Sequence, residues 1–376
     1  DSTRMYQEAV KLSNNHKDNR YLRWRIGRLA YKREDYQAAL NQFLNFQTED
    51  DQTKYSDRFL YWGYKSALHS GLDAKAQSIK NRLIKEYPYN YYGTIVQGDK
   101  FNLQNSAQIQ SARYKDRVNL DRVAKKSKLT DEESYHYRRL KLLKSLNMID
   151  EALLEADRLS SLLDLKVEAE ALFLSVIYNE LGAYLQSFKS QHKISKSQLA
   201  RHSADSLLWQ LNYPLPYLEL ISKKAEEYNV NPFLILAIIK QESGFNSLAK
   251  SRSSALGLMQ IMPETGKKLH KQVNMEEPKF SLYNSDLLYH PAVNITFGIA
   301  LISQLLKKYD NNIVYALAAY NAGEPALQKW LKYNKHLPDD QFVEEISYNE
   351  TKKYIKRVIE NMAIYHLIYK RDFGKE

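Results

Sequence analysis

Three side chains in this sequence combine a reactive or hydrogen-bonding group with a setting that could bury it. Glu242 follows a long apolar run and precedes Gly244 by two residues. Gln260 is the single amide in the apolar stretch 257–263, and Tyr320 precedes a glycine by three residues. A carboxylic acid can protonate the leaving oxygen of an acetal, which departs poorly until it receives that proton. Glu242 is therefore a candidate acid for cleaving a glycosidic bond, although a glutamate at a helix end is more often an ordinary solvated residue. Structural packing alone would explain Gln260 or Tyr320.

The helix expected to carry Glu242 has clear start and stop signals. Asn231 and Pro232 fit the N-cap and the first helical position, and residues 233–239 are apolar without interruption. Gly244 fits the stop. At the C-terminal end of a buried helix, the helix dipole and burial both disfavour a carboxylate. The pKa of Glu242 is therefore expected to rise into the range of a general acid.

Three further elements are expected around this helix. Apolar residues at helical spacing predict an amphipathic helix over residues 217–228. Residues 257–263 predict a buried loop or a short extended piece, because glycine and proline bound them. Residues 316–323 predict a helix with small side chains that stops at its glycine.

Proline separates this region from the rest of the chain. Only Pro88 lies before residue 214, and the other eight prolines follow from Pro214 onward. Proline is rare where long helices stack, because it removes a backbone donor and clashes with the preceding turn. We therefore expect a boundary at residues 212–216 and an almost wholly helical segment before it.

A repeat organises the first part of the chain. The segments Tyr21-Leu-Arg-Trp24 and Arg58-Phe-Leu-Tyr-Trp62 are similar, and their tryptophans lie 38 residues apart. A weaker third copy begins near Tyr135. A period of this length is typical of stacked helix pairs in a solenoid. An irregular all-helical array is the alternative, and it leaves the functional interpretation unchanged.

The residue inventory excludes several classes of chemistry. The chain has no cysteine, so disulfides, thiolate zinc sites and cysteine nucleophiles are ruled out. Its nine histidines show no paired ligand spacing. No Gly-x-Ser-x-Gly elbow, P-loop or Gly-x-Gly-x-x-Gly fingerprint occurs. We therefore expect neither a metal nor a cofactor.

Charge and hydropathy indicate an anionic partner and no membrane span. The net charge of +11 suits a cell-wall polymer, nucleic acid or anionic lipid. Residues from 215 onward hold 21 basic and 18 acidic side chains, which leaves 34 and 26 for the first part. That excess fits a cradle for an anionic polymer or an ordinary solvated face. The longest apolar run, 233–239, is far shorter than the roughly 20 residues that cross a bilayer. No charged-then-apolar leader precedes Asp1, so we expect a soluble, exported chain whose signal peptide has been removed.

Three motifs, taken together, resemble the catalytic domain of one enzyme family. Gln241-Glu-Ser-Gly-Phe-Asn246, the stretch 257–263 and Ala319-Tyr-Asn-Ala-Gly323, in this order and spacing, are similar to the soluble lytic transglycosylases of the lysozyme-like superfamily, which includes goose-type lysozyme. Tyr87-Pro-Tyr-Asn-Tyr-Tyr-Gly93 is similar, more loosely, to the linker between the helical parts of these bacterial enzymes. The resemblance implies an all-α fold with three parts: a helical-repeat superhelical domain (1–124), a helical linker domain (125–214) and a lysozyme-like transglycosylase catalytic domain (215–376).

The resemblance also implies a role for individual residues. Glu242 would be the single catalytic acid and base, and Tyr320 corresponds to the tyrosine that faces the catalytic carboxylate. The residues that would line the cleft near the cleaved bond are Ser251, Gln260 and Met262. Glu350 would help to hold the substrate.

Two positions depart from the family pattern. The family usually has Gly-Ala where this chain has Ser254-Ala255, and Asp-Pro where this chain has His290-Pro291. The first change is expected to stiffen the loop after the catalytic helix, and the second is expected to alter a helix cap. Neither touches the acid.

In the family's reaction the acid protonates the oxygen between N-acetylmuramic acid and N-acetylglucosamine. It then activates the muramic acid's own C6 hydroxyl, which closes a 1,6-anhydro ring in place of adding water. The expected partner is thus the peptidoglycan glycan strand in the periplasm, with no nucleic acid and no set oligomeric state. The alternatives are a goose-type muramidase that hydrolyses the same bond, a noncatalytic peptidoglycan-binding scaffold, and a nucleic-acid binder motivated by the basic charge and the tyrosines.

Overall fold

The structure is a computed structural model that describes residues 2–12, 16–44, 56–98, 129–191, 207–273 and 282–369. The chain divides into two compact units, residues 1–102 and residues 103–376. Over the described residues the secondary structure consists of helices and two isolated backbone bridges. The predicted all-α fold is confirmed. Within this part of the chain no helix is both long and apolar enough to cross a bilayer.

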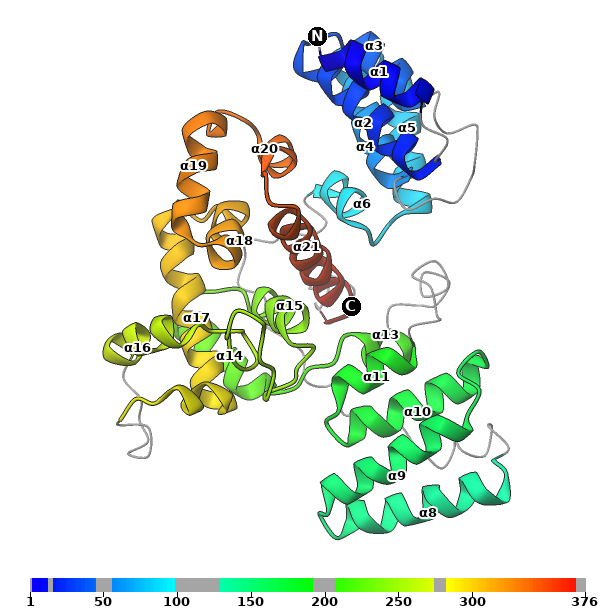
Figure 1. The fold of residues 1–376 in the computed structure, drawn as a ribbon, viewed down its shortest axis with the longest axis vertical. Coiled ribbons are helices and arrows are strands. Elements are labelled where there is room, and N and C mark those ends of the chain that lie inside the picture. Colours follow the sequence, from blue (N-terminus) through cyan, green and yellow to red (C-terminus); the bar gives the residue numbers. More distant parts are fainter. Residues whose placement is uncertain are drawn as a thin grey trace, which may run out of the picture. The chain divides into compact units, whose positions relative to one another are not determined.

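The first unit contains the two repeats (Figure 1). The two repeats contact each other through cation–π pairs. The Arg58 guanidinium lies 3.4 Å from the ring centre of Trp24, and the Arg28 guanidinium lies 3.9 Å from that of Trp62. The repeat of 38 residues thus corresponds to two successive helix pairs, α2–α3 and α4–α5. The helices of this unit are α1 (Ser2–Leu12), α2 (His16–Lys32), α3 (Tyr36–Leu44), α4 (Ser56–His69), α5 (Asp73–Glu86) and α6 (Tyr91–Val96).

The second unit begins, where it is described, with a short array of helices that succeed one another in Figure 1. The weaker third repeat is a helix pair, α8 and α9, whose first helix starts with a capping box between Thr130 and Glu133. Leu140 and Ala152 of this pair are buried, whereas Leu146 is 61% exposed and does not join the core. The helices are α8 (Asp131–Ser145), α9 (Ile149–Leu162), α10 (Glu168–Glu180), α11 (Tyr184–Ser190) and α13 (Leu207–Asn212).

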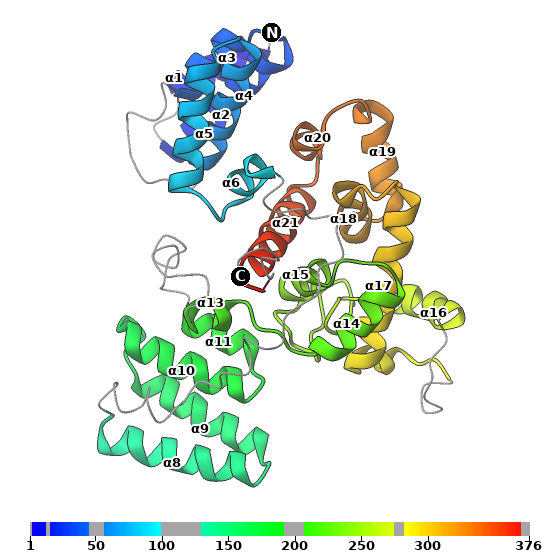
Figure 2. The ribbon, with the colours of Figure 1, turned by 180° about the vertical axis from the view of Figure 1, so that it is seen from behind.

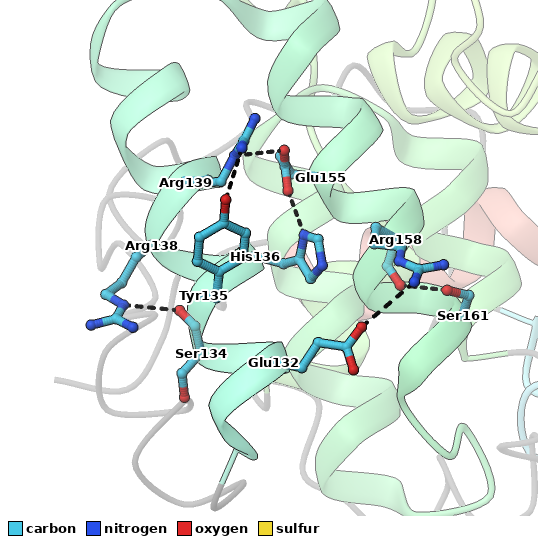
Figure 3. Close-up of polar contacts among 9 residues, drawn as sticks. All are labelled: Glu132, Ser134, Tyr135, His136, Arg138, Arg139, Glu155, Arg158 and Ser161. Carbon is cyan, nitrogen blue, oxygen red and sulfur yellow. Dashed lines mark hydrogen bonds and ion pairs between the residues drawn. The ribbon is translucent and has the colours of Figure 1, made fainter.

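Polar side chains join α8 to α9, as Figure 3 shows. The carboxylate of Glu155 on α9 contacts His136 at 2.6 Å and Arg139 at 3.0 Å, both on α8. The Arg139 guanidinium also donates to the Tyr135 hydroxyl at 3.0 Å. Because Glu155 and His136 are largely buried, this contact fixes the register of the pair more firmly than a surface ion pair would.

The remaining helices form the part of the second unit that carries the predicted chemistry. Helix α15 packs against α14 and against α21 near the end of the chain, and Figures 1 and 2 both draw α15 beside α21. Helix α17 contacts α14, α16 and α18. The helices are α14 (Leu218–Glu227), α15 (Pro232–Glu242), α16 (Pro263–Gln272), the 3-10 helix η5 (Ser285–Tyr289), α17 (Pro291–Lys308), α18 (Ile313–Ala322), α19 (Glu324–Asn334), α20 (Asp339–Glu345) and α21 (Asn349–Tyr369).

The proline-marked junction is held by the C-terminal part of α21. The Tyr369 hydroxyl donates to the Tyr213 carbonyl at 2.7 Å, and the Tyr365 hydroxyl donates to the Pro214 carbonyl at 3.0 Å. The expected boundary between residues 214 and 215 therefore lies inside one compact unit. The boundary expected between 124 and 125 lies outside the described residues. The division into three domains stays a prediction.

Candidate active site

Helix α15 begins and ends where its sequence signals predict. The Asn231 side chain accepts a hydrogen bond from the Phe233 backbone N–H at 2.9 Å, and Pro232 occupies the first turn. Every residue from 232 to 239 is buried. The helix ends at Glu242, and Gly244 follows with a φ of +58°, which a glycine adopts without a Cβ clash.

The Glu242 carboxyl group is held largely away from water. Its side chain is only partly accessible, and burial is the main cause that raises its pKa from 4.5 to about 7. The hydroxyl of Tyr354 opposes this shift, and the negative charge of Glu350 adds to it. At neutral pH a large fraction of Glu242 is therefore protonated, as a general acid requires.

Tyr354, in the first turns of α21, interacts with this carboxyl group. Its hydroxyl is buried without another hydrogen-bond partner among the described residues, and its interaction with Glu242 lowers the glutamate pKa. Burial, and then the charge of Glu242, raises the pKa of Tyr354 well above its ordinary value. The hydroxyl therefore stays protonated and remains available as a donor to the carboxylate.

Tyr320, at the end of α18, interacts electrostatically with the same carboxyl group. Its hydroxyl donates to the Met259 carbonyl at 2.8 Å. Burial, and then the charge of Glu242, raises its pKa well above the ordinary value. Glu242 thus lies among two neutral phenols that come from two different helices.

The loop after α15 is tied to the last turn of that helix. The Ser243 hydroxyl donates to the Leu258 carbonyl at 2.8 Å. Two isolated bridges, Lys250 to Leu256 and Leu256 to Ile261, fold the loop back on itself. The expected short extended piece is thus a bridged turn that packs under the helix end.

Two of the residues expected to line the cleft shape this loop with their side chains. The Gln260 amide donates to the carbonyls of Gly257 at 2.8 Å and Ala249 at 3.2 Å, and its backbone has a φ of +51°. The Ser251 hydroxyl accepts from the Ala255 backbone N–H at 2.9 Å. Neither side chain is hydrogen-bonded to Glu242 in the described structure. Any contact of these groups with substrate remains a prediction.

A buried amide holds the loop from the other side. Asn294 on α17 accepts from the Met259 backbone N–H at 2.7 Å and donates to the carbonyls of Leu256 at 2.8 Å and Leu288 at 2.7 Å. Gly257 must approach this amide closely, since a Cβ there would lie 2.1 Å from the Leu288 carbonyl oxygen and 2.3 Å from the Asn294 amide nitrogen. Asn294 therefore fixes the path of the loop beside the catalytic helix.

The two departures from the family pattern have visible consequences. Ser254 adopts a φ of +67°, a conformation that favours glycine. His290 is the N-cap of α17 and makes no side-chain cap hydrogen bond. Ser254 therefore has a strained backbone conformation in this loop. His290 does not provide the side-chain cap that an aspartate could form at the start of α17.

The structure brings together some of the predicted site residues. Glu242, Tyr320 and Glu350 interact electrostatically. Met262 is 43% exposed at the start of α16. Tyr354 was missed, although it follows Glu350 by four residues and so lies on the same face of α21.

The chemistry of this site is that of a proton donor. A partly accessible carboxyl group with a pKa of about 7 can give up a proton and take one back near neutral pH. The neighbouring Tyr354 hydroxyl can stabilise the carboxylate formed between these two steps. Within the described ranges no three histidine, aspartate or glutamate side chains gather as a metal site would require.

Comparison with known proteins locates this site in a known family. The family described as the transglycosylase SLT domain matches residues 219–343. The matched segment contains five of the six predicted site residues and ends before Glu350 and Tyr354.

Curated relatives carry corresponding names. The chain is 30% identical over 194 residues to the soluble lytic murein transglycosylase of Salmonella typhimurium, in a match that covers 47% of this chain and 30% of the relative. It is 24% identical over 331 residues to the Escherichia coli K12 soluble lytic murein transglycosylase, which covers 84% of this chain and 44% of the relative. The chain thus spans less than half the length of these relatives.

Solved structures share the fold. The lytic transglycosylase Slt of Pseudomonas aeruginosa superposes with a TM-score of 0.66 at 23% identity, over 94% of this chain and 55% of that chain. The 70 kDa soluble lytic transglycosylase of Escherichia coli gives a TM-score of 0.66 at 22% identity, over 96% of this chain and 52% of that chain. The predicted resemblance is thereby confirmed. The chain therefore carries a transglycosylase SLT domain at residues 219–343, and it is similar over most of its length to soluble lytic murein transglycosylases.

Proposed function

We propose that this protein is a peptidoglycan lytic transglycosylase. It cleaves the β-1,4 bond between N-acetylmuramic acid and N-acetylglucosamine and leaves 1,6-anhydro-N-acetylmuramic acid ends. The observation that carries the proposal is the Glu242 carboxyl group, which burial keeps protonated near neutral pH at the end of α15 in an SLT domain. The named relatives support the substrate class.

In the first step the Glu242 carboxyl group gives its proton to the glycosidic oxygen. The bond between that oxygen and C1 of the muramic acid breaks, and N-acetylglucosamine leaves with a new hydroxyl at C4. The positive charge that develops at C1 lies near the carboxylate just formed, which stabilises it. Tyr354 limits the electrostatic penalty of that buried carboxylate, because its hydroxyl stays protonated and its interaction favours the ionised form.

In the second step Glu242 takes a proton from the C6 hydroxyl of the same muramic acid. The C6 oxygen bonds to C1, the 1,6-anhydro ring closes, and the carboxyl group is regenerated without the consumption of water. An intramolecular nucleophile has a high effective concentration, so a second catalytic carboxylate is not required. Ser251, Gln260, Met262 and Glu350 would contact the sugar rings on either side of the cleaved bond.

A muramidase is the second candidate, and one observation favours it. The charge of Glu350 acts on Glu242, so a second carboxylate lies near the acid. Inverting glycosidases use such a second carboxylate to activate water. Glu350 is exposed at the start of α21, however, and the matched family carries transglycosylase names.

Mass spectrometry of digested peptidoglycan separates the two reactions. Purified sacculi incubated with the protein should release muropeptides about 18 Da lighter than the hydrolysis products, because ring closure retains no water. Products with reducing ends alone would establish a muramidase. Binding to sacculi without any cleavage would instead favour a noncatalytic scaffold.

We further propose that the protein acts in the periplasm, where its polymer is found. Its net charge of +11 suits an anionic cell-wall polymer. Fractionation of cells that express the native gene would test the location. Recovery of the protein with the cytoplasmic fraction alone would contradict it.

A further inference from the structure

Lys240, two residues before the proposed acid, contacts the preceding helical array, α8 to α13. Residues two apart on a helix are separated by roughly 200° around its axis, so Lys240 and Glu242 face opposite sides. The Lys240 ammonium group donates to the Asn212 carbonyl at 2.5 Å. It also lies 3.7 Å from the ring centre of Phe188 and 4.7 Å from that of Tyr213.

The acceptor of Lys240 is itself anchored by a polar network inside the helical array. The Asn212 amide donates to the Gln191 side-chain oxygen at 2.6 Å. The Gln191 amide in turn donates to the Ser175 hydroxyl, which lies 2.8 Å from that of Ser187. Gln191 and both serines are buried. These buried hydrogen bonds restrain Asn212, whose backbone carbonyl accepts the hydrogen bond from Lys240.

A second contact joins the same helices on the other side of Glu242. The Phe245 ring packs edge-on against Tyr184 and Phe188 of α11, with ring centres 5.7 Å and 6.4 Å apart. A Cβ added at Gly244 would lie 3.1 Å from the Leu185 side chain. The last turn of α15 is thus held by α11 and α13 both before and after the acid.

We propose that Lys240 is a positioning residue through which α11 and α13 hold the last turn of α15, so that the helical array sets the orientation and burial of Glu242. The inference rests on the proposed function, because it takes Glu242 as the acid. A lysine suits this position, since its stem packs on the rings while its charge satisfies a carbonyl and two aromatic faces. The array is then part of the active site's support as well as a possible surface for substrate.

The first test replaces Lys240 with methionine in the full chain. Lys240→Met keeps the length of the side chain and removes the charge. On soluble uncrosslinked glycan strands we expect kcat to fall by about 10- to 100-fold, with KM within about twofold, because small displacements of a catalytic group have effects of this size. The alkaline limb of the pH–rate profile should move to lower pH as Glu242 gains access to water. Lys240→Arg, which keeps the charge and can stack on rings, should restore most of the rate.

Lys223→Met is the matched control, because Lys223 is an exposed lysine on the neighbouring helix α14. It should leave both kcat and the pH–rate profile unchanged. Phe188→Leu removes one ring from the lysine without altering α15, and it should move the alkaline limb in the same direction. If Lys240→Met does not fold, Phe188→Leu tests the same contact by a change on α11.

A titration that needs no catalysis completes the test. The Glu242 carboxyl signal can be assigned in carbon-13 NMR spectra by its loss in Glu242→Gln. Its pKa should be about 7 in the parent protein and lower in Lys240→Met. An unchanged pKa together with an unchanged kcat would overturn the positioning role. A parent protein that cleaves no glycan would instead overturn the proposed function, and the NMR titration would still decide the role of Lys240.

Discussion

At the scale of single residues, the site depends on a carboxyl group that the fold makes a weaker acid than an ordinary glutamate. Glu242 has a raised pKa chiefly because it is buried, and the neighbouring Tyr354 and Glu350 adjust that value in opposite directions. A protonated acid is needed for the first step, so activity should decline as pH rises through about 7.

Glu242→Gln should abolish most of the activity. An amide cannot donate and recover a proton, and the loss of a general acid and base typically lowers kcat by about 10²- to 10⁴-fold. Release of anhydro-muropeptides from sacculi measures the effect. Glu219→Gln on α14, an exposed position, is the matched control. Full cleavage by the Glu242 variant would assign the acid to another residue.

The same substitution should stabilise the protein at alkaline pH. The pKa of Glu242 is about 7 in the folded protein and 4.5 for an ordinary glutamate. Between these values the folded state binds more protons, so the parent loses stability as pH rises, whereas glutamine does not. We expect the Tm of Glu242→Gln to exceed that of the parent by roughly 2 °C or more at pH 8. This difference should shrink toward zero at pH 4.5, the unfolded value. Calorimetry at both pH values checks the sign.

Two neighbouring substitutions should move the alkaline limb in opposite directions. Tyr354→Phe removes a hydroxyl that lowers the Glu242 pKa, so the limb should move to higher pH. Glu350→Gln removes a negative charge that raises the same pKa, so the limb should move to lower pH. Initial rates on soluble glycan strands across the pH range give both midpoints. Two shifts of the same sign would contradict this account of the site.

At the scale of elements, the loop beside α15 is defined by Asn294 and by strained backbone. Asn294 satisfies one backbone donor and two backbone acceptors of buried segments. Such groups are expensive to leave without partners, because burial removes their hydrogen bonds to water. The geometry around the acid is therefore supported from α17 as well as from α21.

Asn294→Ala should lower the free energy of unfolding by about 2–4 kcal/mol, since it strands several buried polar groups at once. The rate should fall with it, because the loop that carries Met259 also holds Tyr320. Gln304→Ala, at an exposed position of the same helix, is the control. Urea unfolding of the three proteins measures the difference. Equal midpoints for Asn294→Ala and Gln304→Ala would show that the loop is held elsewhere.

Ser254→Gly should raise stability slightly. A positive φ is unfavourable for serine by about 1–2 kcal/mol, and glycine in turn loses about 0.5–1 kcal/mol through its freer unfolded chain. The expected net gain is about 0.5 kcal/mol, with little change in rate. Thermal unfolding of the variant and the parent tests this sign. A loss of stability would mean that the serine side chain makes a compensating contact.

The elements were largely predictable from sequence, and the contacts between distant elements were not. The Asn231 cap, the Gly244 stop and the helix that ends at Gly323 are local signals, and each is confirmed. Tyr354 was missed because its burial against Glu242 arises only when α21 packs on α15. The Ser251 and Gln260 side chains were expected at the cleft, and the structure adds that they form hydrogen bonds with the loop backbone. These bonds could not be predicted, because they depend on the backbone conformation of the loop.

At the scale of the whole molecule, the chain has two compact units and an uneven distribution of charge. The helical character of the first part and its helix-pair repeat followed from proline usage and from the 38-residue offset, whereas the all-α fold of the whole chain followed from the family resemblance. The curvature of the helical array did not, because it depends on small rotations between successive helices. The excess of positive charge lies mainly before residue 215.

Salt should weaken binding to sacculi only moderately. Exposed charges are screened beyond about 8 Å at physiological ionic strength, so scattered lysines contribute little. For Glu242→Gln we expect roughly a tenfold loss of affinity or less between 50 and 200 mM salt, against about 10³- to 10⁵-fold for proteins that contact many nucleic-acid phosphates. A co-sedimentation assay and a parallel gel shift with DNA measure both partners. A steep salt dependence with DNA alone would favour the nucleic-acid alternative.

The packing of α15 against α21 also gives the protein an order of maturation. Tyr354 follows Glu242 by about a hundred residues, and α21 both covers the acid and fastens the Tyr213–Pro214 segment. While a ribosome is still making the chain, Glu242 has no such cover and ionises like any glutamate in water. We therefore expect an acid strength suited to sugar chemistry only after α21 docks on α15, so a chain that lacks α21 should cleave no glycan.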